Sequence, residues 1–494
     1  MNTNVTNFFK NKNVTVLGLG LLGRGTGDTK FLIEHCAHVT CTDSRSKEKL
    51  AESIAFVTQD NPENLELVIG ELRYSDFENK DFILLCPGMP KDDPYIAHAR
   101  SKGIPVYMSA ALVVDLVYRY LDHIKVIGVT GTRGKSTATM MIHHMLTSMG
   151  KHVHLGGNVR GVANLPLLKD IRVGDYILME LDSWQLQGFG DLQISPQISV
   201  FTSFLDDHLN YYKGDRSAYF NDKAIIYRWQ KESDILIASQ QATEIILNYE
   251  KNNHNVSFEE IKNKIIVPSI FNQNMHLIGE HNRVLAGLAN EVGIRLGLDY
   301  DDIVKGISSF KAVDGRLQYL GEIQIQASTA TMQTQASPLT PLHKRGEQLK
   351  EYKKVHIYND NNATTPDATV VGIEAVNDKY KQPCVLICGG ADKGLDLSSM
   401  IETITDKSKV REIILLTGTG SEKLKEGLKD LKQELKDFEF LERETLKECV
   451  QTAIEVAEDD DVILYSPGFA SFSPYFKNEY EKNDEFVRCV SEML

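Results

Sequence analysis

Cysteine is scarce in this chain, and its arrangement excludes two classes of protein. The seven cysteines are odd in number and include no Cys-x-x-Cys pair and no zinc-binding spacing. A small disulfide-linked scaffold and a zinc ribbon are therefore both excluded. We expect reduced thiols that pack as small hydrophobic side chains.

Long apolar segments are also absent. The first residues, Met1 to Asn7, contain no basic group and do not lead into an apolar stretch. Even the apolar segment from Ala110 to Tyr118 is interrupted by Asp115, and it is far shorter than the ~20 residues that a bilayer span needs. The sequence therefore predicts no membrane span and a cytoplasmic location.

Positive charge is in deficit. Lysine and arginine number 54 against 68 aspartates and glutamates, which gives a formal net charge of −14. A protein whose main task is to grip nucleic acid or an anionic membrane carries the opposite balance. We expect no nucleic-acid partner, although local basic pockets for small anions are compatible with this charge.

What the sequence does contain is typical of a multidomain α/β protein. Its 494 residues exceed what one core supports, and 42% hydrophobic with 25% charged residues are ordinary values for a globular protein. Strand-like and helix-like segments alternate throughout. We predict three α/β domains: a Rossmann-like domain at 1–115, a central P-loop ATPase-like parallel sheet at 116–312, and a second Rossmann-like domain at 313–494.

The most informative segment is Thr130-Gly131-Thr132-Arg133-Gly134-Lys135-Ser136-Thr137, between the apolar run 126–129 and the helix-like run 138–142. In such a strand–loop–helix the glycine-bearing backbone cradles phosphate, the lysine reaches the β- and γ-phosphates, and the serine hydroxyl binds Mg²⁺. The general pattern has its first glycine at position 129, where this chain has Val129, so the loop is a variant. It predicts an ATP or GTP site, and a chance Gly-Lys-Ser in an ordinary turn is the alternative.

A second glycine turn, Gly18-Leu19-Gly20-Leu21-Leu22-Gly23, lies near the N-terminus. It follows a strand-like segment at 14–17, and another strand-like segment ends at Asp43, 20 residues after Gly23. Taken literally, this is the dinucleotide-binding pattern, in which the acid binds a ribose of NAD. Because a lone Gly-x-Gly-x-x-Gly is a weak signal, another nucleotide and a purely structural turn stay open.

Polar residues follow other strand-like segments of the central region. Glu180 ends the segment 176–180, and Asp206-Asp207-His208 follows the segment 198–201. The carboxyl ends of parallel strands meet at one edge of a sheet, where carboxylate and imidazole groups beside a phosphate loop suit Mg²⁺. Each of these residues alone is more often solvated or satisfied than metal-bound, but together they predict a metal site.

The last third of the chain contains strand-like segments at 384–388, 412–416 and 462–466. A tract at about 325–350 interrupts it, with low apolar periodicity, two prolines and the basic cluster His343-Lys344-Arg345. Such a composition cannot contribute much to a core. We predict an exposed insertion without chemistry of its own.

Together these motifs resemble the Mur ligase family along nearly the whole chain apart from the 325–350 tract. The matching blocks, in the family's order, are Thr130 to Thr137, Gly156-Gly157-Asn158, Glu180 to Leu186, Asp207 to Asn210 with Tyr212, Tyr219 to Lys223, Gly279 to Asn282, Gly315-Arg316, Asn359 to Thr364, Gly389-Gly390 with Lys393, and Ser466 to Asn478. The N-terminal turn, with Asp43-Ser44-Arg45 and Pro87-Gly88, resembles that of the member that adds D-glutamate.

The resemblance implies an enzyme that uses ATP to join a carboxylate to an amine through an acyl phosphate, in the synthesis of peptidoglycan precursors. Its substrates would be UDP-N-acetylmuramoyl-L-alanine, D-glutamate and ATP, and we expect a monomer. The residues implied to bind ATP are Gly131, Thr132, Arg133, Gly134, Lys135, Ser136, Thr137, Asn282, Arg316 and Asp360. The last two belong to the third domain or its boundary, so closure of that domain over the nucleotide is expected.

The resemblance also implies two Mg²⁺ ions, held by Ser136, Glu180, His208 and Lys223. The catalytic residues would be Lys135, Glu180, His208 and Lys223. Lys223 matches a lysine that the family carries as a carbamate, which converts a cation into an anionic oxygen ligand. An ordinary solvated lysine on a helix is the alternative for this residue.

Two further sets of residues are implied for the other substrates. The UDP-linked substrate would contact Gly18, Leu19, Gly20, Leu21, Leu22, Asp43, Arg45, Asn158 and Gln185. A uridine diphosphate would then take the place of NAD, since a glycine turn binds a pyrophosphate whatever nucleoside it carries. The incoming amino acid would contact Thr364, Lys393 and Ser471.

The chain departs from the family's motifs at four places. Leu285 replaces an asparagine near the adenine, Asn361-Asn362 replaces a Ser-Lys, Asp182 replaces a small hydroxyl residue, and Ser473-Pro474-Tyr475 lengthens a loop. L-Glutamate or another amino acid therefore stays open, as does the activity of another Mur ligase or of a folylpolyglutamate synthase-like enzyme. Outside enzymes, the alternative is an NAD-binding regulatory or redox protein.

Overall fold

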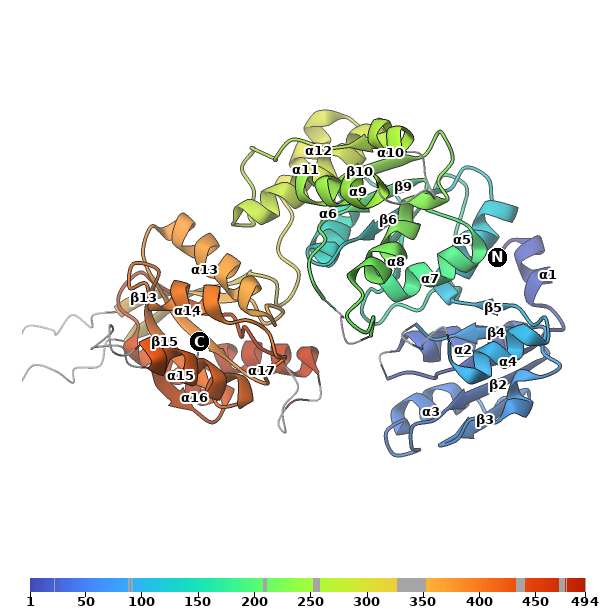
Figure 1. Ribbon diagram of the computed structural model, residues 1–494, viewed down its shortest axis with the longest axis horizontal. Coiled ribbons are helices and arrows are strands. Elements are labelled where there is room, and N and C mark those ends of the chain that lie inside the picture. The colour runs from blue at the N-terminus through green and yellow to red at the C-terminus, as the bar shows by residue number, and fades with distance from the viewer. Residues whose placement is uncertain are drawn as a thin grey trace, which may run out of the picture. The chain divides into compact units, whose positions relative to one another are not determined.

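The computed structural model describes residues 1–21, 23–87, 89, 92–207, 211–251, 258–326, 352–431, 440–470, 476 and 478–493. Three sheets with helices packed on them follow one another along the chain (Figure 1). The described residues form two compact units, residues 1–274 with 283–310 and residues 275–282 with 311–494. Two sheets belong to the first unit and one to the second, which confirms the predicted α/β class.

The N-terminal sheet has five parallel strands in the order β3-β2-β1-β4-β5. Its strands are β1 (Asn13–Leu17), β2 (His38–Asp43), β3 (Leu65–Ile69), β4 (Phe82–Leu85) and β5 (Val106–Tyr107), and its helices are α1 (Thr3–Phe9), α2 (Arg24–His35), α3 (Ala51–Thr58), the 3-10 turn η1 (Tyr74–Phe77), α4 (Pro94–Ser101) and α5 (Ser109–Tyr120). The strand order reverses between β1 and β4, and ligands of open α/β sheets bind at such a point.

The central sheet has six parallel strands in the order β11-β10-β9-β6-β8-β7. Its strands are β6 (Lys125–Thr130), β7 (Val153–Gly157), β8 (Tyr176–Glu180), β9 (Ile198–Phe201), β10 (Ile235–Ala238) and β11 (Ile265–Ile266), and its helices are α6 (Lys135–Ser148), the 3-10 turn η2 (Leu165–Lys169), α7 (Ser183–Leu192), α8 (Arg216–Arg228), α9 (Gln240–Lys251), α10 (Phe258–Lys264), α11 (Glu280–Arg295) and α12 (Tyr300–Ser308). Because β6 lies between β8 and β9, its carboxyl end opens at the centre of the sheet.

The C-terminal sheet has the order β12-β13-β17-β14-β15-β16, and only its edge strand β12 is antiparallel to its neighbour. Its strands are β12 (Gln318–Gln326), β13 (Tyr352–Asn359), β14 (Cys384–Gly389), β15 (Val410–Leu416), β16 (Leu441–Arg443) and β17 (Asp461–Tyr465), and its helices are α13 (Pro366–Tyr380), α14 (Ser398–Thr405), α15 (Thr419–Leu431), α16 (Leu446–Val456) and α17 (Glu479–Ser491). The predicted insertion lies between β12 and β13, and apart from its first two residues, which end β12, it falls outside the described residues.

Within the first unit, the N-terminal and central sheets are joined where α2 meets η2, a contact we call the α2–η2 junction. A Cβ atom added at Gly27 would lie 2.5 Å from the Cβ of Ala163, so the glycine permits a close approach. The buried carboxylate of Asp28 accepts a hydrogen bond from the backbone N–H of Leu165 at 2.8 Å. The two layers are therefore held together by packing and by a buried polar contact.

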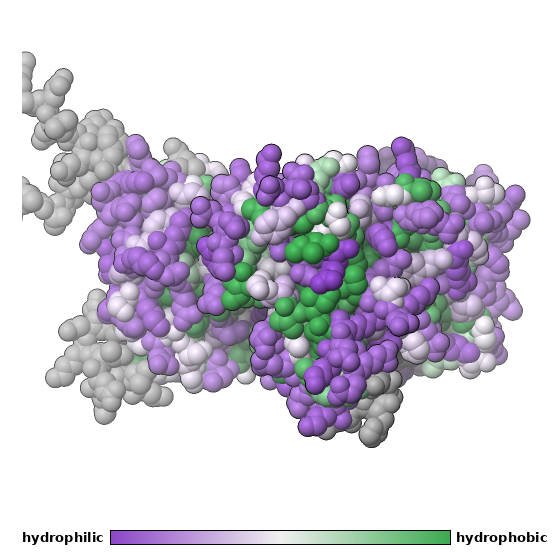
Figure 2. Space-filling model, turned by 90° about the horizontal axis from the view of Figure 1, so that it is seen from above, coloured by the Kyte–Doolittle hydropathy of each residue, from purple (hydrophilic) through white to green (hydrophobic). Residues whose placement is uncertain are grey.

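The thiols and the surface agree with the composition. All seven cysteines are free, and all except the half-buried Cys86 are buried, which confirms their predicted packing as small hydrophobic side chains. No helix in the described part of the chain has the length and apolarity that a bilayer span requires. Hydrophilic residues predominate on the face shown in Figure 2, and hydrophobic residues gather in one broader area near the centre of this view.

Candidate active site

The segment between β6 and α6 forms a tight phosphate-sized loop. Gly131 and Gly134 have φ angles of 148° and 80°, in the region that favours glycine. A Cβ atom at Gly131 would lie 2.0 Å from the hydroxyl oxygen of Thr202, so no other residue fits there. The predicted order of strand, loop and helix is present, and the loop's backbone opens at the amino end of α6.

Thr202 and Ser203, just beyond β9, fix the shape of this loop. The Thr202 hydroxyl donates to the carbonyl oxygens of Thr130 (3.1 Å) and Arg133 (2.5 Å). The Ser203 hydroxyl accepts from the backbone N–H of Arg133 at 2.9 Å. Because β9 and β6 are neighbours in the sheet, the loop is held by its own sheet and is positioned before any ligand arrives.

Two lysines meet at one backbone oxygen of the loop. Lys135 Nζ donates to the carbonyl oxygens of Gly131 (3.0 Å) and Thr132 (3.2 Å). Lys223 Nζ, from α8, donates to the same Gly131 oxygen at 2.8 Å. The sequence interval between Lys223 and Gly131 is 92 residues, so only the fold brings them together. The result is a cluster of two amino groups where a phosphate would approach.

Lys223 is buried to an unusual degree for a lysine. Its side chain is among the largest fully buried ones and lies over the ring of Tyr219. Burial, and next the positive charge of Lys135, bring the pKa of Lys223 well below its usual range, although three nearby aspartates oppose the shift. The alternative of a solvated lysine is therefore wrong. A buried amine with a lowered pKa is a nucleophile near neutral pH.

Carboxylate groups lie around the same edge of the sheet. Glu180 is buried and ends β8 opposite Val129 of β6, at the edge of the sheet from which the loop starts. Asp182 accepts a hydrogen bond from the backbone N–H of Gln185 at 2.8 Å, as the capping residue of α7. The presence of an aspartate at position 182 is therefore explained by its role as the cap of α7. Its negative charge also raises the pKa of Lys223 and so opposes the effect of burial.

Of the four residues predicted to hold Mg²⁺, the structure describes Ser136, Glu180 and Lys223. His208, together with Leu22 and Ser471, lies outside the described residues. Among the described residues, no three His, Cys, Asp or Glu side chains are grouped as a metal site. The donor chemistry of Ser136 and Glu180, a hydroxyl and a carboxylate oxygen at a phosphate loop, fits Mg²⁺.

The N-terminal turn resembles the central loop in having a glycine at positive φ directly before a helix. Gly18, Gly20 and Gly23 have φ angles of 95°, 79° and 82°, and α2 begins directly after Gly23. Close packing requires the first of these glycines, since a Cβ atom at Gly18 would lie 2.8 Å from the Cβ of Cys86. Leu21, by contrast, is 56% exposed and contributes no packing of its own.

The chain's own groups engage the carboxylate of Asp43. It accepts hydrogen bonds from the backbone N–H of Leu19 (3.0 Å) and from Arg45 Nε (2.9 Å) and Nη2 (2.5 Å). Burial alone would raise the pKa of Asp43, but the hydrogen bonds and charge of Arg45 outweigh it and lower the pKa. The Asp43 carboxylate therefore stabilises the glycine turn through Leu19 and fixes the side chain of Arg45 beside it.

A residue that sequence reasoning missed lies at the start of α2. Arg24 Nη1 donates to the side-chain oxygen of Asn158 at 2.5 Å, which brings a cation of the first layer to a predicted substrate residue of the second. A cation in the first turn of a helix opposes the helix dipole and is unfavourable there without another role. The position of Arg24 directly after Gly23 was therefore the sign in the sequence that this residue has a function. Gln185, also predicted to bind substrate, is fully buried, and its Nε2 makes no hydrogen bond with a described residue.

Leu285, one of the departures from the resemblance, packs against the central loop. A Cβ atom at Gly134 would lie 2.8 Å from Leu285 Cδ2, so the leucine side chain covers the glycine. The substitution therefore exchanges a polar group for an apolar contact at the loop's second glycine.

In the second unit, the predicted ligands fall into three groups. Asn282 is buried and donates to the carbonyl oxygen of Ile278 at 2.8 Å. The Asp360 carboxylate accepts from the backbone N–H of Leu317 (3.0 Å), and so it holds the turn that carries Arg316. Lys393 Nζ donates to the Thr364 hydroxyl at 3.0 Å, which brings together two of the three residues predicted to receive the amino acid.

Comparison with known proteins gives three domain matches in the same order as the three sheets. Residues 12–108 match the Mur ligase MurD-like N-terminal domain, residues 129–284 match the Mur ligase middle domain, and residues 344–469 match the Mur ligase glutamate ligase domain. Each match contains one of the motif groups described above. The glycine turn, the phosphate loop and Lys393 thus lie in three domains of one family's architecture.

Whole-chain relatives and solved structures agree with these matches. The chain is 27% identical to a UDP-N-acetylmuramoylalanine–D-glutamate ligase from Borreliella afzelii, with 97% of this chain and 98% of that protein covered, and 29% identical to one from Clostridium perfringens, with 98% of each covered. Among solved structures, UDP-N-acetylmuramate-alanine ligase from Thermotoga maritima covers 98% of this chain and 100% of its own, at a TM-score of 0.56 and 15% identity. The MurF ligase of the same organism, solved with ADP, also has a TM-score of 0.56, at 13% identity, with 99% and 100% covered.

Proposed function

The chain belongs to the Mur ligase family and is an ATP-dependent ligase, and from this premise we propose that it adds D-glutamate to UDP-N-acetylmuramoyl-L-alanine. The MurD-like match of the first domain and the names of the whole-chain relatives support this choice of substrates. The reaction belongs to peptidoglycan precursor synthesis. We propose that it takes place in the cytoplasm, where ATP and UDP-linked sugars are available.

The observation that carries the proposal is the pair of lysines on the Gly131 oxygen. A ligase of this kind must bring a carboxylate against the γ-phosphate of ATP, and each like-charge contact at ~4 Å costs on the order of 4 kcal/mol at an effective dielectric near 20. Lys135 lies at the phosphate loop and Lys223 beside it. The two lysines are therefore placed where the substrate carboxylate must approach the γ-phosphate. Lys135 supplies positive charge there, and Lys223 supplies either positive charge or, if modified, a ligand for a cation.

In the proposed reaction, a carboxylate oxygen of the substrate attacks the γ-phosphorus of ATP, and ADP leaves. The amine of glutamate then attacks the carbonyl carbon of the acyl phosphate, and inorganic phosphate leaves. Lys135 stabilises charge on the transferred phosphate, and the backbone N–H groups of Gly131 to Ser136 orient it. Asn282, Arg316 and Asp360 are the proposed contacts to the rest of ATP.

Ser136, Glu180 and His208 would hold Mg²⁺, which when bound neutralises phosphate oxygens. We propose that Lys223 is a carbamate in the working enzyme. Its lowered pKa supports this, because a neutral amine attacks CO₂ and loses a proton to give an anionic carbamate. A lysine in that form supplies oxygen ligands instead of repelling a cation.

The UDP-linked substrate is proposed to bind along the first unit. Its diphosphate would lie on the N–H groups of the Gly18–Gly23 turn at the start of α2, with Arg45 as a neighbouring cation. Asn158 and Gln185 would contact the muramoyl part, and Arg24 extends this set because it donates to Asn158. Thr364, Lys393 and Ser471 would receive the amino acid, with Lys393 suited to a free carboxylate.

The experiment is a phosphate-release assay on the purified chain with Mg²⁺-ATP and UDP-N-acetylmuramoyl-L-alanine. D-Glutamate, L-glutamate, L-alanine and L-lysine are supplied in separate reactions, and the products are identified by mass spectrometry. We expect release only with D-glutamate, with the mass of the UDP-N-acetylmuramoyl dipeptide. Release that depends on another amino acid would reassign the substrate, and no release with any of them would overturn the proposal.

A further inference from the structure

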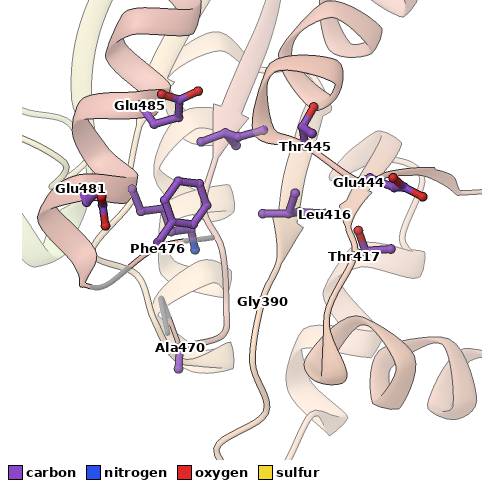
Figure 3. A pocket seen from close by; sticks show the side chains of 11 residues that line it. Gly390, Leu416, Thr417, Glu444, Thr445, Ala470, Phe476, Glu481 and Glu485 are labelled. Atoms are coloured by element: carbon purple, nitrogen blue, oxygen red, sulfur yellow. The ribbon is translucent and has the colours of Figure 1, made fainter. Parts of the chain in front are cut away.

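A pocket of about 290 Å³ lies in the second unit, at the carboxyl edge of the C-terminal sheet. Its walls come from residues at the ends of β14 and β15, from the start of α16 and from α17 (Figure 3). Open α/β sheets bind their ligands at this edge. The pocket is therefore in a position where the fold commonly holds a small molecule.

Lys482 of α17 lines this pocket and is only 1% exposed. Its Nζ atom is buried and makes no hydrogen bond with a residue that the structure describes. Tyr465 lies under it, with 5.7 Å between Nζ and the ring centre, but the face of a ring does not satisfy three N–H donors. A buried ammonium without an acceptor is costly, and a ligand that brings an anionic oxygen removes that cost.

The acidic residues of the pocket do not neutralise this lysine. Figure 3 shows Glu481 and Glu485 on one side of the pocket and Glu444 on the other. Glu444 and Glu481 are exposed, and Glu485 forms an ion pair with Arg488 at 2.7 Å. No ion pair among the described residues joins any of the three to Lys482. The interior of the pocket is therefore cationic, while its rim is acidic.

A second feature adds positive potential to the interior. Thr445 and Leu446, at the first turn of the 11-residue helix α16, line the pocket. Thr445 caps the helix by accepting from the backbone N–H of Glu448, and the remaining N–H groups of the first turn carry the positive end of the helix dipole. Together with the buried ammonium, this end of α16 favours an anion.

The pocket adjoins the residues assigned to the incoming amino acid. Gly390 lines it, and the next residue, Ala391, exchanges backbone hydrogen bonds with Ala470, which also lines it. Lys393, in the same loop, donates to Thr364. Burial, and next the charge of Lys393, lower the pKa of Lys482 to about 7, so the two amino groups are close enough to interact.

We propose that Lys482 binds the side-chain carboxylate of the incoming amino acid and makes the enzyme selective for a dicarboxylate. The proposal rests on the proposed ligase function. Lys393 with Thr364 then holds one carboxylate, and Lys482 in its pocket holds the other. A neutral amino acid leaves the buried ammonium unpartnered, so it is rejected by the cost of that group. Lys482 is thus a specificity-determining residue.

The test compares D-glutamate with its neutral isostere D-glutamine. In Lys482→Met, which keeps the length and removes the charge, kcat/KM for D-glutamate should fall about 10- to 100-fold, as for the loss of a hydrogen bond to a charged group. The value for D-glutamine should change little, so that discrimination collapses. Lys381→Met is the matched control, because Lys381 is exposed before β14 and should leave both values unchanged.

A structural role for Lys482 predicts a different result. Both amino acids would then lose kcat/KM together, or the KM values for ATP and the UDP-linked substrate would rise, and either outcome would overturn the proposal. Wild-type enzyme that shows no D-glutamate-dependent phosphate release would instead defeat the proposed function itself. The two failures are therefore distinguishable in the same set of assays.

A second measurement covers the case in which Lys482→Met does not fold. Lys482→Arg keeps the positive charge at all pH values. In the wild type, KM for D-glutamate should rise above pH 7 as Lys482 loses its proton, and the arginine variant should lack that rise. Cys449 and Tyr465, which face Lys482, stay neutral in this range because burial raises the pKa of Cys449 to about 12 and raises the pKa of Tyr465 well above its usual range.

The other charged groups near Lys482 do not produce the same pH dependence. Glu481 and Glu485 on α17, and Lys393, are common to both proteins, so any effect of theirs on KM would be the same in each. An identical rise of KM with pH in the wild type and in Lys482→Arg would contradict the assignment. A rise confined to the wild type would support it.

Discussion

The first unit contains two glycine turns that lie at equivalent places in their sheets and have different chemistry around them. Both follow a parallel strand, both use glycine at left-handed φ, and both lead directly into a helix. Two amino groups lie beside the central turn, whereas beside the N-terminal turn an aspartate and an arginine neutralise each other. On the proposed binding modes the backbone of each turn would hold a phosphate, and the side chains around it would decide whether that phosphate also becomes reactive.

The largest effect should come from removing the lysine of the central turn. We expect Lys135→Ala to lower kcat by about 10³-fold or more, because the transferred phosphate loses its nearest protein cation. Binding of the UDP-linked substrate, measured by calorimetry without ATP, should remain. Comparable losses of catalysis and of UDP-substrate binding would show that the two turns are not functionally separate.

Nearly as large an effect is expected at Lys223. Lys223→Ala should abolish turnover, and a short carboxylate in solution should restore part of it by replacing the carbamate oxygens. Replacing Lys231, an exposed lysine beyond the same helix, by alanine is the control and should leave kcat unchanged. Full activity of Lys223→Ala would remove the carbamate from the mechanism.

A substitution at the N-terminal turn should weaken substrate binding and leave the chemical step unchanged. Arg45→Ala is expected to raise KM for the UDP-linked substrate by about 10- to 100-fold, the range of a lost charge-assisted hydrogen bond, with kcat little changed. A fall in kcat with constant KM would be the opposite of this prediction. It would mean that the first turn takes part in the chemical step, and the contrast between the two turns would disappear.

The smallest effect concerns the α2–η2 junction that joins the two sheets. Burial raises the pKa of Asp28 from its usual 3.8 to about 6. The folded state then binds the proton more tightly than the unfolded state, so this group's stabilising contribution is full below pH 3.8 and is lost as pH rises through 6. Asp28→Asn removes this dependence, which amounts to about 3 kcal/mol at most.

Melting temperatures of the wild type and Asp28→Asn at pH 5 and pH 7.5 test that expectation. The asparagine oxygen can still accept from the N–H of Leu165, so the variant should gain stability relative to the wild type at the higher pH. Parallel changes in both proteins would show that Asp28 does not titrate between these values.

Segments with a continuous apolar run were predictable from the sequence, and segments with mixed patterns were not. The strand-like segments predicted at 384–388 and 462–466 are present as β14 (Cys384–Gly389) and β17 (Asp461–Tyr465), since buried parallel strands are apolar on both faces. Strand β13 was missed because Lys353 and Lys354 follow its first residue and interrupt the apolar pattern. Lys353 donates to backbone oxygens at the end of α16. That partner is a hundred residues away and leaves no local sign.

The candidate site also has a part that could be predicted from the sequence and a part that could not. Both glycine turns could be predicted, because the residues that define each one are adjacent in the sequence. Sequence alone could not predict that Lys223 would lie on the Gly131 oxygen, that Arg24 would contact Asn158, or that Lys482 would be buried at a pocket. These features depend on which strands are neighbours in the finished sheets.

The α2–η2 junction has a consequence for substrate length. Gly27 against Ala163 and Asp28 on Leu165 leave the N-terminal and central layers no room to slide past each other. A substrate anchored by its diphosphate at one turn and presenting its carboxylate at the other must therefore span a constant gap. If the UDP-linked substrate binds as proposed, we therefore expect a sugar nucleotide one amino acid longer to place its carboxylate away from the phosphate at the central turn.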